Sequence, residues 1–124
     1  MRSDGTVVAI GNNESGQCNV GNWKDIIAIS AGESFTIGLR SDGTVVATGS
    51  NSFKQCNVAD WTDIVAISAG TSHTVGLRSD GTVVAAGESY DDSCRVSSWK
   101  NIVAVSAGLS HTVGLCSDGT VVAV

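Results

Sequence analysis

Short apolar runs separated by turns recur along the chain. One such series contains three runs rich in β-branched residues and a shorter fourth run: residues 63–69, 72–78, 82–86 and 55–58. Asp80-Gly81 joins two of them and suits a tight hairpin turn, because both residue types tolerate positive φ. In 63–69 and 82–86, apolar side chains occupy both the odd and the even positions, which point to opposite faces of a strand. This predicts a sheet that is covered on both faces. No stretch has helical periodicity, so the pattern predicts an all-β fold.

This series repeats with a constant period of 38 residues. The tetrapeptide Ser-Asp-Gly-Thr begins at Ser3, Ser41, Ser79 and Ser117. A tryptophan and a cysteine keep the same spacing: Trp23, Trp61, Trp99 and Cys18, Cys56, Cys94. A fixed period of this length is typical of propellers, solenoids and arrays. Repeats of four antiparallel strands buried on two sides favour β-propeller blades. The alternative, a β-trefoil, also uses three four-stranded repeats but explains neither the two-sided burial nor the strand repeated at both ends.

We divide the single array, residues 1–124, into a partial blade, two blades and a second partial blade: 1–20, 25–58, 63–96 and 101–124. Three blades cannot close a ring, since propellers typically have about four to eight. The two ends carry complementary strands, so we expect two chains to form a six-bladed homodimer by strand exchange. A truncated or engineered fragment with no native ligand is the alternative.

Three motifs of the repeat resemble a known family. They are Ile67-Ser68-Ala69-Gly70, Ser72-His73-Thr74-Val75-Gly76-Leu77 and Asp80-Gly81-Thr82-Val83-Val84-Ala85. Together they resemble the regulator of chromosome condensation repeat family, and Gln-Cys-Asn-Val before a tryptophan (17–20, 55–58) is similar to its bacterial members. The resemblance implies a propeller, commonly of seven blades. It also implies two alternative activities, guanine nucleotide exchange on small GTPases and enzyme inhibition, as in a similar bacterial propeller that inhibits β-lactamases. The third repeat departs from the pattern at 93–96.

Two histidines are the strongest candidates for catalysis. His73 and His111 share the alternation of apolar neighbours, and Phe35 occupies the equivalent position in the first repeat. A catalytic base is not interchangeable with phenylalanine, so we interpret both histidines as packing residues that point into the sheet interface. Every serine or aspartate that could complete a triad is a repeated turn residue. We therefore expect no enzyme activity.

The cysteines and acidic residues lack the spacing of metal sites. Cys18, Cys56 and Cys94 occupy equivalent places on blades that diverge, so we expect them to pack rather than to share a metal. The Asp-Gly turns lack the dense ligand spacing of a calcium loop, and no Gly-rich loop precedes a helix. These patterns predict neither a metal nor a cofactor.

Charge and hydropathy exclude further classes of partner. The net charge is −5, and the seven Lys and Arg residues are scattered, which disfavours binding to nucleic acid or to an anionic membrane. No apolar run has the length of a membrane span, and no secretory signal is recognisable. Together with cysteines that lack obvious partners, this favours a cytoplasmic location.

Sequence variation among the repeats is concentrated between certain strands. In an up-and-down blade, the first-to-second and third-to-fourth connections lie on one rim, and the invariant Ser-Asp-Gly-Thr turn lies on the other. Such variation has two explanations. Surface loops can vary without effect on the fold, or the variable residues can form a binding surface with exposed aromatic anchors. We predict that this module binds protein through the variable rim, whose candidate residues are Glu33, Phe53, Lys54, Thr71, Tyr90, Asp91, Asp92 and Leu109.

Overall fold

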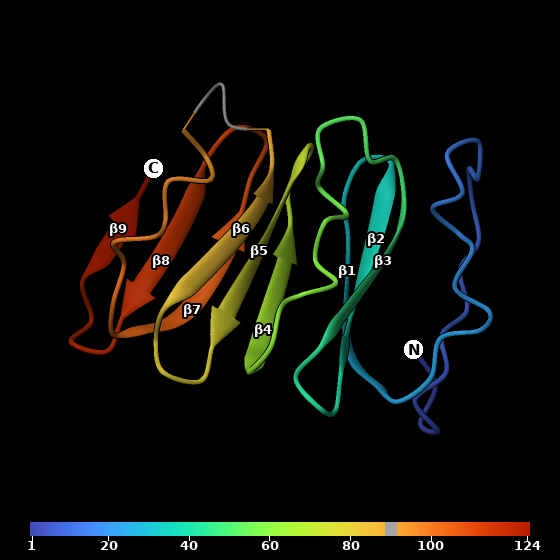
Figure 1. The fold of residues 1–124 in the computed structure, drawn as a ribbon, viewed down its shortest axis with the longest axis horizontal. Helices are drawn as coiled ribbons and strands as arrows, with labels where there is room; N and C mark the ends of the chain where they lie inside the picture. Colours follow the sequence, from blue (N-terminus) through green and yellow to red (C-terminus); the bar gives the residue numbers. More distant parts are fainter. Residues whose placement is uncertain (89–91) are drawn as a thin grey trace.

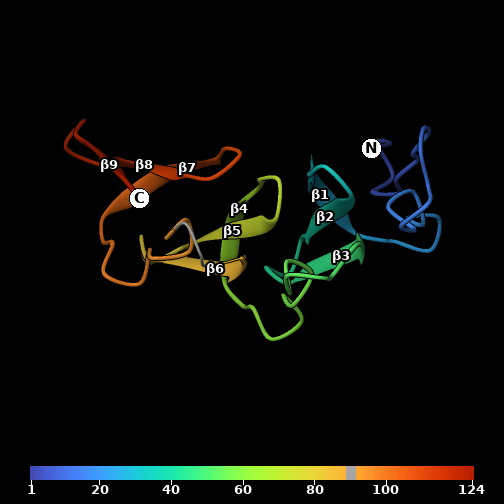
Figure 2. The same cartoon turned by 90° about the horizontal axis from the view of Figure 1, so that it is seen from above.

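The computed structural model describes residues 1–88 and 92–124 as a row of three antiparallel sheets (Figure 1). Each sheet has three strands in sequence order: β1 Ile26–Ala31, β2 Phe35–Arg40 and β3 Val45–Gly49; β4 Ile64–Ala69, β5 His73–Arg78 and β6 Val83–Gly87; β7 Ile102–Ala107, β8 Thr112–Cys116 and β9 Val121–Ala123. Seen from above, the sheets follow one another along a row from the N-terminal to the C-terminal segment (Figure 2). The predicted all-β fold and its three main strands per repeat are confirmed, with boundaries that differ by one residue.

The predicted fourth strand of each blade is wrong. Residues 55–58 form turns rather than a strand, and the sheets are three-stranded. Their backbone amides bond locally: Asn57 N donates to Lys54 O at 3.0 Å, and Val58 N donates to Cys56 O at 2.9 Å. Because these amides are used within the turn, they are not available for a ladder with the third strand. The segment still packs on the next blade through its side chains.

Residues 1–20 also depart from the predicted partial blade. They contain no strand, although Thr6-Val7-Val8-Ala9-Ile10 repeats the sequence pattern of β3 and β6. A strand is defined by its hydrogen-bonded neighbour, and no other strand of the described chain lies beside these residues. Val8 and Ile10 are consequently exposed.

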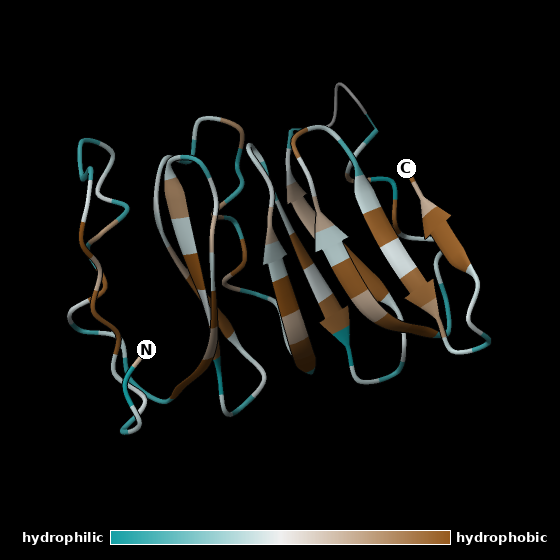
Figure 3. Ribbon diagram, turned by 180° about the vertical axis from the view of Figure 1, so that it is seen from behind, coloured by the Kyte–Doolittle hydropathy of each residue, from teal (hydrophilic) through white to brown (hydrophobic). Residues whose placement is uncertain are grey.

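An apolar cluster is repeated at each contact between successive blades. The middle one joins Val45 and Val58 of one repeat to Trp61 and Ile64 of the next, and all four are buried. The equivalent sets are Val7, Val20, Trp23, Ile26 and Val83, Val96, Trp99, Ile102. We call each set a junction cluster. Each cluster places a tryptophan between successive repeats. Burial of each large apolar side chain stabilises the fold by about 1.5–3 kcal/mol. Figure 3 shows the apolar segments along the strands of all three sheets.

The invariant Ser-Asp-Gly-Thr turn contributes a backbone bond to the same junction. Gly43 O accepts a hydrogen bond from Ile64 N at 3.0 Å, and Gly81 O accepts one from Ile102 N at 3.0 Å. A Cβ at Gly43 would lie 3.3 Å from the Asp63 backbone, and φ there is +83°. Only glycine combines that conformation with that close approach. The turn is therefore invariant because it binds the next blade.

Polar groups complete the contacts between the first strands of neighbouring sheets, β1, β4 and β7, which we call the inner strands. Ser30 Oγ accepts a hydrogen bond from Ala69 N at 3.0 Å, and Ser68 Oγ accepts one from Ala107 N at 2.9 Å. His73 lies 2.9 Å from Thr112 Oγ1 through Nε2. The single hydroxyl proton of Thr112 is donated to Ser93 O at 2.7 Å, so His73 Nε2 is the donor of the other bond.

The two histidines differ in burial. His73 is buried like its equivalent Phe35, which confirms the predicted packing role. His111 is exposed, so the prediction that it also points into sheet packing is wrong. The physical reason is that His73 contacts the following sheet, whereas no sheet follows β7–β9 in the described chain.

Gly76 tests the junction cluster. A Cβ at this glycine would lie 2.8 Å from the Trp61 ring, so Gly76→Ala must displace the indole. We expect a loss of about 1–3 kcal/mol in the free energy of unfolding, because overpacking strains a filled core. Urea unfolding measures the loss. Gly21→Ala is the matched control, because its Cβ meets nothing within 4 Å. Equal stability of the two variants would contradict the cluster.

The aspartates of the invariant turns make folding sensitive to acid. Thr44 donates its hydroxyl and its backbone amide to Asp42 at 2.6 and 3.0 Å. These bonds, the hydroxyl bond first, lower the pKa of the Asp42 carboxyl below the ordinary value of 3.8, and Thr82 lowers that of Asp80 in the same way. A lowered folded-state pKa contributes stability above the unfolded-state pKa, and this is lost as pH falls through the folded value.

We therefore expect the thermal midpoint to fall as the pH decreases below about 4, with a shallower fall in the double variant Asp42→Asn/Asp80→Asn. The amide keeps an oxygen acceptor but does not titrate. Circular dichroism melting over a pH series measures both slopes. Identical slopes for the variant and the original chain would rule out this source of acid sensitivity.

Candidate protein-binding rim

The variable connections lie at one end of the sheets. In Figure 1 the connections β1–β2, β4–β5 and β7–β8 are at the top, together with the loops that follow β3 and β6. The invariant turns β2–β3, β5–β6 and β8–β9 are at the bottom. We call the upper end the variable rim. It carries all the described candidate residues, whereas Tyr90 and Asp91 fall outside the described residues.

The loops after the third strands have a common polar frame. Asn51 Oδ1 accepts a hydrogen bond from Cys56 N at 2.8 Å, and Asn51 Nδ2 donates to Asn57 Oδ1 at 3.0 Å. Asn13 makes the same two bonds, to Cys18 N and to Asn19 Oδ1. Gln55 Oε1 accepts from Phe53 N at 3.0 Å. An asparagine therefore closes each of these two loops and leaves the residues between its anchors free to vary.

A positive φ recurs at one position of these loops. It is +80° at Gly16, +66° at Lys54 and +64° at Asp92. These residues are 38 positions apart in sequence and occupy the same place in the repeat. The chain thus keeps a positive φ at this place while the residue there is a glycine, a cation or an anion.

The third loop replaces part of the frame with an ion pair. Arg95, which stands where the other repeats have Asn19 and Asn57, bonds Asp92 at 2.8 Å through Nε. Both side chains are largely exposed, so this pair contributes little stability. Arginine at position 95 therefore makes an ionic contact within its loop, where Asn19 and Asn57 make amide hydrogen bonds in theirs.

The rim presents apolar side chains to solvent. Phe53 is 42% exposed and Leu109 is 73% exposed, although large apolar side chains are usually buried. Glu33, Lys54 and Asp92 are also exposed, whereas Thr71 is half-buried. Glu33 and Thr71 line the same depression of about 270 Å³ above the inner strands, between Gly32 and Gly70. Phe53, Lys54, Asp92 and Leu109 do not line it, so the rim is an extended surface.

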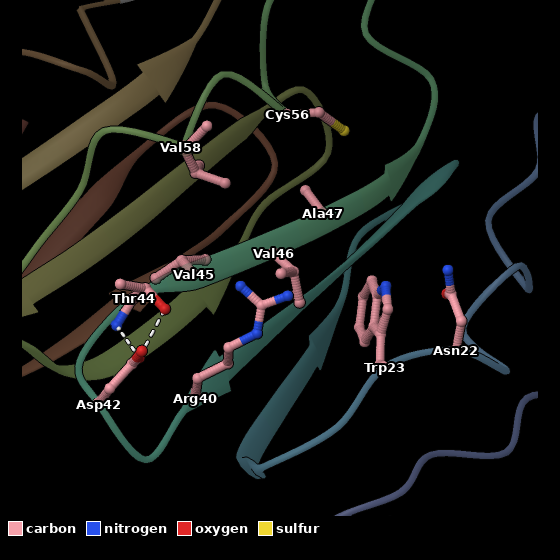
Figure 4. Close-up of a pocket in the computed structure, with 11 residues that line it drawn as sticks. Asn22, Trp23, Arg40, Asp42, Thr44, Val45, Val46, Ala47, Cys56 and Val58 are labelled. Carbon is pink, nitrogen blue, oxygen red and sulfur yellow. Dashed lines mark hydrogen bonds between the residues drawn. The ribbon is translucent and has the colours of Figure 1, made fainter.

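A larger cavity of about 560 Å³ lies elsewhere, beside β3 (Figure 4). Trp23, Val45 and Cys56 line it, together with Asp42. Figure 4 shows the Asp42 carboxylate bonded to Thr44 within its own turn. The main lining residues recur in the other repeats. This cavity follows from the divergence of two blades and carries no feature of a site specific to one of them.

The described residues offer no alternative chemical centre. No group of three His, Cys, Asp or Glu residues that could hold a metal occurs among them. Cys56 Sγ donates to Ser50 O at 3.2 Å, and burial raises the pKa of the Cys56 thiol. A raised pKa disfavours the reactive thiolate. Across residues 1–88 and 92–124, no helix could span a membrane.

Sequence reasoning missed the asparagines that build the rim. The sequence pattern places Asn51 in a variable loop and predicts a strand at Asn57. The signal that identifies them is an asparagine pair six residues apart, repeated at Asn13 and Asn19. Such a pair is typical of side chains that close a loop rather than of a strand.

The comparisons with known proteins agree with this geometry. A family model for the regulator of chromosome condensation (RCC1) repeat matches residues 26–55 and 64–92, which contain the first two sheets. These two segments of the chain are thus similar to RCC1 repeats. No curated protein has significant sequence similarity to the chain.

Solved structures share the fold of these RCC1 repeats. The chain superimposes on yeast RCC1 (Prp20), solved bound to Kap60, with a TM-score of 0.76 at 19% identity, covering 96% of this chain and 39% of that one. It superimposes on the ectodomain of the Physcomitrella patens receptor kinase CR4 with a TM-score of 0.71 at 19% identity, covering 91% and 34%. For human WBSCR16 the TM-score is 0.67 at 17% identity, covering 77% and 32%. The chain thus has the fold of β-propeller blades in an unclosed row, and it spans about a third of the length of these proteins.

Proposed function

We propose that the chain is a non-catalytic RCC1-repeat module that binds a protein through its variable rim. The observation that carries this proposal is the positive φ shared by Gly16, Lys54 and Asp92, equivalent loop positions with different side chains. A fixed frame with variable side chains holds contact residues at a low entropic cost of ordering on binding. The opposite rim has no such freedom, because its turns bind the next blade.

The composition of the rim suggests the kind of protein. Phe53 and Leu109 offer exposed apolar contacts, and apolar and aromatic anchors are typical of the energetic centre of an interface. Glu33 adds negative charge to the rim, Asp92 is paired with Arg95, and the chain as a whole has a net charge of −5. The partner we propose is a protein surface with an apolar patch and basic residues, rather than a nucleic acid, whose phosphates would be repelled.

The solved relatives support a protein partner in general terms. Yeast RCC1 was crystallised bound to Kap60, and a second study of Prp20p describes its binding to Gsp1p and histones. These partners belong to those proteins, of which the present chain spans 39%.

We also propose that the 124-residue chain associates with a second copy to close a six-bladed ring. The supporting observation is the solvent exposure of both outer faces of the row. Ile29 is exposed on the first sheet, whereas its equivalent Ile67 packs against a junction cluster. Leu115 and Val121 are exposed on the third sheet, whereas their equivalents Leu39 and Val83 are buried between blades. Soluble monomers rarely expose large contiguous apolar patches.

The double variant Phe53→Ser/Leu109→Ser tests the rim. Both side chains are exposed, so the fold persists while the apolar anchors are removed. We expect at least a tenfold loss in the recovery of proteins that the original chain retains from a cell extract, quantified by mass spectrometry. The matched control is Ser41→Ala/Ser79→Ala, on the exposed invariant rim, and it should retain them all. Binding that is unaffected by the rim variant, or lost equally in the control, would overturn the proposal.

A further inference from the structure

A groove beside the first sheet repeats one side of an interface found inside the chain. It has a volume of about 430 Å³ and lies between residues 7–18 and β1–β2, where Val8, Ile10, Ile29 and Phe35 line it. At the equivalent place in the second repeat, β2 and the side chains Phe35 and Ile37 pack against Ile67 and Ala69. The groove therefore has the shape and the apolar lining that accept a first and a second strand of a blade.

Gly11 identifies the missing neighbour. Its φ of +130° matches +113° at Gly49 and +138° at Gly87. A Cβ at Gly49 would lie 2.5 Å from Ser34 O, and at Gly87 it would lie 2.4 Å from Ser72 O, because the second strand of the blade passes there. At Gly11 it would meet nothing within 4 Å. The backbone at Gly11 thus has the conformation that accommodates a second strand, and the space for that strand is open.

Polar groups at the two ends of the row are complementary. Ser68 Oγ accepts from Ala107 N across a junction, but in the described part of the chain no such bond across a junction is made to the equivalent Ser106 Oγ or by the equivalent Ala31 N. The exposed ring of His111 is equivalent to that of His73, which donates to Thr112. Thr36, the first-sheet equivalent of Thr112, lines the groove. One end thus presents Ser106 and His111, and the other presents the groups that they would bind.

The third strand of the composite blade is present twice. Residues 6–10 and 120–124 read Thr-Val-Val-Ala-Ile and Thr-Val-Val-Ala-Val. Val7 is 5% exposed within a junction cluster, whereas its equivalent Val121 in β9 is 62% exposed. In a closed ring, the third strand of a blade contributes a valine to the junction cluster with the next blade. Residues 6–10 already do so through Val7. In competition for the edge of β8, residues 6–10 are favoured over β9.

We infer that the groove binds the β7–β8 hairpin of a second copy, with residues 6–10 replacing β9 beside β8; this inference rests on the self-association proposed above. By analogy with the pairing of β5 with β6, Leu115, Gly114 and Val113 of one copy lie opposite Val7, Val8 and Ala9 of the other. His111 then bonds Thr36, and Ser106 accepts from Ala31 N. Two such exchanges related by a twofold axis give four blades within single copies and two composite blades.

Two cysteine pairs distinguish exchanged from unexchanged strands. Thr112 and Val124 exchange both backbone hydrogen bonds, so the neighbouring pair Val113–Ala123 is a non-hydrogen-bonded pair, whose Cβ atoms are close enough for a disulfide. The same geometry holds for Val113 and Ala9 of the other copy in the exchanged form. The experiment places Ala9→Cys/Val113→Cys, and separately Val113→Cys/Ala123→Cys, in a background with Ser at positions 18, 56, 94 and 116. Analytical ultracentrifugation first gives the mass of each reduced chain.

We expect twice the chain mass of 12.6 kDa in solution, a covalent dimer after oxidation of the 9–113 pair, and at least a tenfold lower yield of the intramolecular 113–123 link. A dimeric mass with the 113–123 link and no 9–113 link contradicts strand exchange and leaves self-association standing. A monomeric mass at every soluble concentration contradicts both.

Deletion of residues 120–124 from the chain with its native cysteines provides a second measurement. Because β9 is displaced in the exchanged dimer, the shortened chain should dimerise at least as tightly as the full chain. Conversion of the dimer to a monomer by this deletion would contradict the inference, since it would show that β9 itself holds the dimer together.

Discussion

The contact between successive blades is the interaction on which the rest of the structure depends. A three-stranded sheet with apolar side chains on both faces cannot bury them alone, so each sheet needs a neighbour on each side. The sequence meets this need with one unit repeated every 38 residues: the junction cluster, the glycine carbonyl of the invariant turn and the inner serine. Because every contact uses the same unit, the faces at the two ends of the row carry complementary halves of it.

This constraint separates the two rims. Gly43 and Gly81 hold the lower turns against the next blade, and a side chain there would combine a strained positive φ with a tight contact to the backbone of that blade. The upper loops are closed within themselves by Asn13 and Asn51, so their outer residues do not contribute to the junctions. Sequence can vary at the upper rim without loss of the fold, and this is the physical basis for a binding role there.

The sequence predicted the parts of the fold that local chemistry determines. The Asp-Gly turns and β-branched runs located the main strands to within a residue, because turn geometry and alternation fix both. Residues 55–58 have the composition of a strand, but the amides of Asn57 and Val58 bond within a turn, which alternation does not reveal. His111 has the pattern of His73, and its exposure depends on a neighbouring sheet rather than on its own segment. The rim residues were located by their variation, whereas the asparagines that shape the rim needed the three-dimensional contacts.

Hydrogen exchange at the junction amides tests this account most directly. Ile64 N and Ile102 N each donate to the glycine carbonyl of the preceding blade, and Ala69 N and Ala107 N donate to the inner serines. If the junctions hold the structure together, these four amides exchange together and among the slowest in the chain. Exchange of the four at the rate of rim-loop amides, with the sheets still protected, would show that each sheet is stable without its neighbours and would contradict the account.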